Sequence, residues 1–110
     1  MDTLTRREEQ VLLAVWDLQH NAHLLAIRDH LSKITRKEWS VGIIHKPLLK
    51  LEKDGYITSS MGNATARRGG RRKKLYTVAP LGIDGLKALR KEQDAIWKNF
   101  LEAAVIEDHS

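Results

Sequence analysis

The sequence of 110 residues contains no cysteine, which excludes disulfide bonds and thiolate metal sites and fits a reducing cytosol. It has no apolar run close to the roughly 20 residues that span a bilayer, and residues 1–9 are too charged for a signal peptide. It also lacks the motifs of a catalytic serine elbow, a Walker phosphate loop and a dinucleotide-binding loop. These absences indicate a cytoplasmic protein that is not an enzyme and needs no cofactor, and a length of 110 residues indicates one compact domain.

Acidic residues are absent from residues 67–74, which read Arg-Arg-Gly-Gly-Arg-Arg-Lys-Lys. The whole chain has 19 Lys and Arg against 14 Asp and Glu, so removing these six cations leaves 13 against 14, a net charge of −1. The positive charge is therefore concentrated in one short segment. Such a segment is typical of a binding site for a polyanion.

Local signals predict three short helices in the first half of the chain. Thr5-Arg6-Arg7-Glu8 fits a capping box and predicts a helix that runs to about Gln19. A second helix is expected from about Leu24, and a third should begin after the N-cap Ser40 and end at Gly55. The apolar residues expected to face the core from the second and third helices are Ile27, Leu31, Ile34, Val41, Ile44, Leu48 and Leu51.

The second half of the chain predicts a hairpin and one long helix. The β-prone segments Tyr56–Ser60 and Leu75–Val78 flank a loop rich in Gly and Arg, which predicts a hairpin with an extended tip. Pro80 suits the first position of a fourth helix, which should reach about Val105. Its apolar stripe consists of Leu86, Leu89, Ile96, Trp97, Phe100, Leu101 and Ala104.

The predicted order of elements is three helices, a hairpin and a long helix. This order gives a mostly α fold with a two-stranded β-wing (α+β), the winged helix-turn-helix arrangement. The helix that begins after Ser40 would be the recognition helix, and residues 61–74 would form the wing.

Two sequence motifs carry a family resemblance. Residues 40–57 read Ser-Val-Gly-Ile-Ile-His-Lys-Pro-Leu-Leu-Lys-Leu-Glu-Lys-Asp-Gly-Tyr-Ile, and residues 68–82 read Arg-Gly-Gly-Arg-Arg-Lys-Lys-Leu-Tyr-Thr-Val-Ala-Pro-Leu-Gly. They resemble the signature of the PadR family of bacterial transcriptional regulators, S-x-G-x-[LI]-Y-x-x-L-x-x-L-E-x-x-G-[LY]-[IV] followed by a Gly/Arg-rich wing that ends R-K-x-Y-x-L-T-x-x-G. The resemblance covers roughly residues 5–100. In this chain His45 replaces the family's Tyr, His23-Leu24 replaces an aromatic-Gly pair, and Ala79 replaces a helix-capping Thr.

The resemblance implies a bacterial cytoplasmic regulator that is located at the nucleoid when it is bound to DNA. It would be a homodimeric repressor that binds a palindromic operator in double-stranded DNA, and a small-molecule effector would release it. Residues 1–79 would form the DNA-binding domain, and residues 80–110 the dimerisation helix and tail, packed as one unit with the N-terminal helix. The apolar stripe of the long helix would form the dimer contact. Because some related regulators bind planar aromatic effectors near this contact, Trp16 and Trp97 are candidates for an effector pocket.

Two groups of residues are the candidates for DNA contact. On the third helix, Ile43, Lys46 and Lys50 are expected to share the outer face, where lysines suit phosphates or guanine edges and Ile43 suits a thymine methyl. In the wing, arginines beside flexible glycines suit the narrow minor groove, and the lysines suit phosphates. The candidates are Ser40, Ile43, His45, Lys46 and Lys50 in the helix and Arg67, Arg68, Gly69, Gly70, Arg71, Arg72, Lys73 and Lys74 in the wing.

Other interpretations stay open at this stage. Residues 67–74 would also fit a solvated basic loop, and the charged face of the third helix an ordinary amphipathic surface. Two functions of other classes also stay open. The chain could be a winged-helix module that docks proteins or RNA, or a binding protein that senses a ligand or a metal. His20 and His23 have a metal-like spacing but lack a third carboxylate or thiolate partner, so no metal site is expected.

Overall fold

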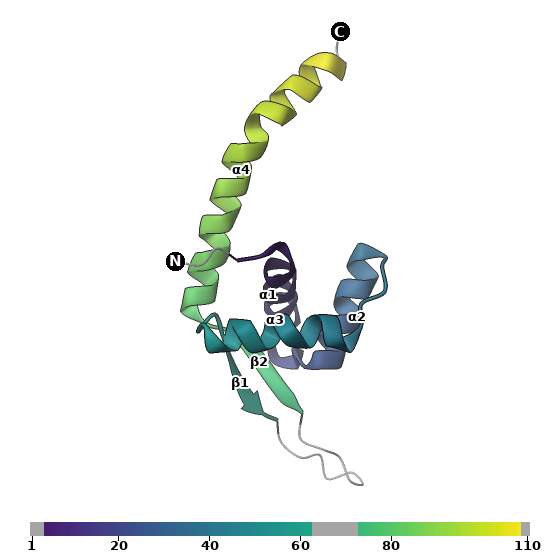
Figure 1. Cartoon of the computed structure of the whole chain (residues 1–110), viewed down its shortest axis with the longest axis vertical. Helices are drawn as coiled ribbons and strands as arrows, with labels where there is room; N and C mark the ends of the chain where they lie inside the picture. Colours follow the sequence, from purple (N-terminus) through teal and green to yellow (C-terminus); the bar gives the residue numbers. More distant parts are fainter. Residues whose placement is uncertain (1–3, 63–72, 109–110) are drawn as a thin grey trace.

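The computed structural model describes residues 4–62 and 73–108, with side chains up to residue 104. Three helices pack together and are followed by a two-stranded antiparallel hairpin and a long helix (Figure 1). This arrangement confirms the predicted fold class. The elements are α1 (Arg6–Leu18), the short 3-10 turn η1 (Gln19–Asn21), α2 (Leu24–Thr35), α3 (Val41–Lys53), β1 (Ile57–Met61), β2 (Lys74–Val78) and α4 (Pro80–Asp108).

The first and third helices begin where local capping chemistry predicts. The Thr5 amide donates to Glu8 Oε1 at 2.9 Å and the Glu8 amide donates to Thr5 Oγ1 at 3.1 Å, a complete capping box. Ser40 Oγ accepts from the Ile43 amide at 3.2 Å at the start of α3. After α3, Gly55 adopts a φ of +85°, the left-handed conformation that glycine adopts without steric cost.

The core lies between α1, α2, α3 and the inner face of the hairpin. In register, Ile57 pairs with Val78 and Ser59 with Tyr76, and the alternation of strand side chains buries Ile57, Tyr76 and Val78 on one face. The Tyr76 amide donates to the Ala22 carbonyl at 2.9 Å, which fixes β2 to the turn before α2. The helices contribute the buried residues Val11, Leu12, Ala14, Val15, Ile27, Leu31, Ile44, Leu48 and Leu51.

The prediction that Ile34 faces the core is wrong, because its side chain is 60% exposed. The neighbouring Thr35 turns inward in its place: Thr35 Oγ1 donates to the Leu31 carbonyl at 2.7 Å and accepts from Trp39 Nε1 at 2.8 Å. One turn beyond Leu31, the inner face of α2 is therefore polar, and Ile34 is rotated toward solvent.

The long helix α4 leads away from the three-helix body (Figure 1), and the molecule extends 65 Å along its longest axis. Its first turn packs tightly, since a Cβ placed on Gly82 would lie 2.3 Å from the Tyr56 carbonyl oxygen. Farther along, Ile96, Trp97, Phe100 and Leu101 are more than half exposed. None of the helices within residues 4–62 and 73–108 has the length and hydropathy that a membrane-spanning helix requires.

Candidate nucleic-acid interface

Helix α3, the predicted recognition helix, presents a mixed basic and apolar face to solvent. Its opposite side is fixed to the core by the buried residues Ile44, Pro47, Leu48 and Leu51. The exposed side carries His45 and Lys46, both predicted, and also Leu49 and Lys53, which sequence reasoning missed. Leu49 is 50% exposed. Leu49 does not share the helical face of Ile44, Leu48 and Leu51, and this difference in spacing could have identified it as an exposed apolar residue. Ser40 lies exposed at the N-terminus of the helix.

Two of the predicted contact residues, Ile43 and Lys50, lie on the flank of α3 that faces α1. Together with Arg7, Lys46 and other residues they line a hollow of about 390 Å³. Lys50 Nζ lies 3.1 Å from Asp54 Oδ2 and 3.7 Å from an Oε2 atom of the buried Glu8. Its charge is therefore already partly compensated within the protein.

The other flank of α3 is connected to the hairpin through Glu52. Lys74 Nζ donates to Glu52 Oε1 at 3.2 Å, and the Ser59 hydroxyl donates to Glu52 Oε2. The hydrogen bond from Ser59, with a further contribution from Lys74, lowers the pKa of Glu52, and the hydrogen bond to Glu52 raises the pKa of Lys74. The predicted phosphate contact Lys74 is thus held by a carboxylate, and Glu52 links α3 to both strands.

The described part of the hairpin ends at Gly62 on one side and resumes at Lys73 on the other. The Gly62 amide donates to the Lys73 carbonyl at 2.7 Å, and the Lys73 side chain is exposed at the base of the wing. The remaining predicted wing contacts lie outside the described residues: Arg67, Arg68, Gly69, Gly70, Arg71 and Arg72.

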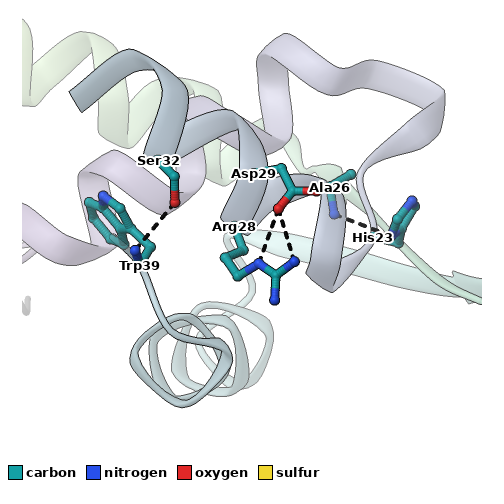
Figure 2. Close-up of polar contacts among 6 residues, drawn as sticks. All are labelled: His23, Ala26, Arg28, Asp29, Ser32 and Trp39. Carbon is teal, nitrogen blue, oxygen red and sulfur yellow. Dashed lines mark hydrogen bonds and ion pairs between the residues drawn. The ribbon is translucent and has the colours of Figure 1, made fainter. Parts of the chain in front are cut away.

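The start of α2 lies close to the base of the wing and has an unusual cap. Nδ1 of His23 accepts from the Ala26 amide at 3.3 Å (Figure 2). Burial of the ring lowers the pKa of His23, the charge of Lys73 lowers it further, and Asp29 raises it. One ring nitrogen of His23 is therefore used as a helix cap. Among the described residues, no group of three His, Cys, Asp or Glu side chains could hold a metal ion.

The predicted pair Trp16 and Trp97 lies differently relative to the hollow between α1 and α4. Trp97 lines a hollow of about 370 Å³ between α1 and α4, with Leu4, Leu13 and Leu89 among the other lining residues. Trp16 is 47% exposed and is not among the residues that line this hollow. The Trp97 ring also contacts Phe100 edge to face, with centroids 5.6 Å apart.

Comparison with solved structures identifies the class of fold. A transcriptional regulator from Clostridium thermocellum superposes with a TM-score of 0.69 at 20% identity, covering 87% of each chain. RosR from H. salinarum gives 0.65 at 18% identity, covering 96% of this chain and 94% of its own. A PadR family transcription regulator from Clostridium difficile gives 0.60 at 19% identity, covering 93% and 98%. No protein-family model matches the sequence, and a search of curated proteins found no significant match.

The chain therefore has a winged helix fold with a long C-terminal helix. More specifically, its fold is that of PadR-like regulators, which confirms the predicted resemblance at the level of the fold.

Proposed function

We propose that this protein is a sequence-specific transcriptional regulator that binds double-stranded DNA as a homodimer. We further propose that it is a repressor released from a palindromic operator by a small-molecule effector. The observation that carries the proposal is the solvent face of α3, where His45, Lys46, Leu49 and Lys53 lie beside a hairpin whose loop is strongly basic. The solved regulators of the same fold support it.

The two parts of the interface have different roles in this proposal. An α-helix fits the major groove, where lysines suit guanine edges or phosphates and apolar side chains suit thymine methyl groups. His45, Lys46 and Leu49 would therefore select the sequence, with Ile43 at the edge of the contact. The arginines of the wing would add affinity through phosphates and the minor groove, which is largely independent of sequence.

The long helix α4 supplies the second half of the proposal. Residues 1–79 would bind DNA and residues 80–110 would hold two copies together. The stripe formed by Ile96, Trp97, Phe100 and Leu101 is more than half exposed in the single chain, whereas Leu86, Leu89 and Ala104 are partly covered. Contiguous apolar surface of this kind is typical of an interface, and a two-fold dimer would match the symmetry of a palindromic operator.

The hollow between α1 and α4 is the proposed effector site. Trp97 and Leu89 come from the dimerisation helix, and Leu4 and Leu13 come from the N-terminal segment and α1. A planar ligand between these elements would change the angle of α4 against the DNA-binding part. Because α4 would connect the two copies, this angle sets the spacing between the two recognition helices.

A mobility-shift assay on the DNA upstream of the protein's own gene tests DNA binding. The quadruple variant R67A/R68A/R71A/R72A should bind much more weakly than the wild type, and its binding should depend less steeply on salt because cations that contact phosphates are removed. Undiminished binding by this variant would remove the wing from the mechanism. A preference for duplex RNA of the same sequence would replace the operator proposal with an RNA-binding function.

A further inference from the structure

A second group of basic side chains lies on the flank of α3 opposite the wing. A hollow of about 480 Å³ is formed there by the start of α1, the turn between α2 and α3, and the first turn of α3. Its lining includes Arg7, Lys37, Trp39 and Ile43. Arg7 and Ile43 also line the neighbouring hollow of about 390 Å³, which extends to Lys46. The two hollows therefore form one groove along the α1 side of the recognition helix.

Trp39 is held in a fixed position in the wall of the hollow of about 480 Å³. Its backbone amide donates to Ser32 Oγ at 3.2 Å (Figure 2), and its Nε1 donates to Thr35 Oγ1 at 2.8 Å. The Arg7 guanidinium lies over the indole ring, 5.0 Å from its centroid, in the geometry of a cation–π contact. An arginine held on a fixed ring loses less side-chain freedom when it binds an anion, which favours binding.

The basic side chains around α3 differ in whether a carboxylate already lies beside them. Lys50 and Lys74 each lie within 4 Å of a carboxylate. Within the part of the chain that the structure describes, no ion pair involves Arg7, Lys37 or Lys46. Glu38 is one acid in the lining, and Glu8, in the neighbouring hollow, is already placed beside Lys50. The groove is therefore positive and available to an external anion.

We infer that Arg7 and Lys37 form a second phosphate-binding surface, which contacts the DNA strand on the α1 side of the major groove. This inference rests on the proposed DNA binding. A helix with its side chains is about 10–12 Å wide and the major groove is about 12 Å wide, so a backbone strand runs along each flank of an inserted helix. The wing contacts the backbone strand on one flank of α3, and the groove that contains Arg7 and Lys37 contacts the strand on the other flank.

The test compares the salt dependence of binding to a mixed-sequence duplex of about 30 base pairs, because phosphate contacts do not depend on sequence. The variant R7Q/K37Q removes two cations from the groove. The control K87Q/K91Q removes two exposed cations from α4, which leads away from α3 (Figure 1). Both variants change the net charge from +5 to +3.

For R7Q/K37Q we expect the slope of log affinity against log salt to decrease by about 1.8, with an affinity loss of roughly tenfold or more at about 0.1 M salt. The control should change the slope by less than about 0.5, and the charge-conserving variant R7K/K37R should keep the wild-type slope. Thermal melting confirms that all variants fold.

Two results would overturn the inference: an R7Q/K37Q slope equal to that of the wild type, or an equal decrease in R7Q/K37Q and the control. Failure of the proposed function has a different signature, because wild-type protein would then bind no duplex even at low salt.

Discussion

The proposed dimer predicts that Phe100 contributes strongly to the free energy of dimerisation. A phenylalanine side chain has roughly 200 Å² of surface, and 62% of Phe100 is exposed in the single chain. Burying this remainder, about 125 Å², would contribute about 3 kcal/mol per copy at 25 cal/mol/Å². Two copies give an upper bound of about 6 kcal/mol. If half of that area is buried in the dimer, it contributes about 3 kcal/mol. Phe100→Ala loses this contribution, so the dimer Kd should increase about 100-fold.

The matched control is Lys91→Ala, an exposed residue of the same helix outside the apolar stripe. Sedimentation equilibrium or light scattering over a range of concentrations would give both Kd values. Because Phe100 is mostly exposed and contacts Trp97 only edge to face, the variant should lose less than about 1.5 kcal/mol of folding stability. A folded F100A with the wild-type Kd, or a wild type that stays monomeric at tens of micromolar, would refute the α4 dimer.

Two further predictions concern the fold. Folding holds the pKa of His23 below its ordinary 6.5, so the unfolded chain binds more protons below that pH and the folding stability falls as the pH drops through this range. The variant His23→Asn caps the helix without titrating, so it should flatten the profile of stability against pH between about pH 5 and 7. An unchanged profile would exclude the His23 cap as the cause of the pH dependence. In urea unfolding, Gly82→Ala should lower the free energy of unfolding by about 2–3 kcal/mol, because the added Cβ would lie 2.3 Å from the Tyr56 carbonyl oxygen. A Cβ added at Gly42 would meet no neighbouring atom within 4 Å, so Gly42→Ala should stabilise α3 by about 0.5–1 kcal/mol. Equal effects of the two variants would contradict the packing described at α4.

The features that could be predicted from the sequence are set by residues close to one another in the chain. The Thr5–Glu8 capping box, the Ser40 cap, the left-handed Gly55 and the start of α4 at Pro80 all depend on a few neighbouring residues. For this reason the order of elements and the position of α3 in the chain could be predicted correctly.

The features that could not be predicted depend on contacts between distant parts of the chain. Glu52 and Lys74 are 22 residues apart, so the sequence offered no sign that this wing lysine is held by a carboxylate. The cation–π contact between Arg7 and Trp39 likewise forms only when α1 packs beside the turn that precedes α3. Ile34 was misplaced because the periodicity of α2 does not show that Thr35 finds two polar partners on the inner face.

The most direct test of the central claim is a selection of DNA fragments from the genome of the organism that encodes the protein. Wild-type protein should enrich fragments with a palindromic site whose half-sites lie about one helical turn, roughly 10 base pairs, or a multiple of it apart. The α3 variant H45A/K46A should lose this enrichment but keep weak, salt-sensitive binding through the wing. Equal recovery of fragments by wild type and variant, or recovery of none by the wild type, would contradict sequence-specific binding by α3.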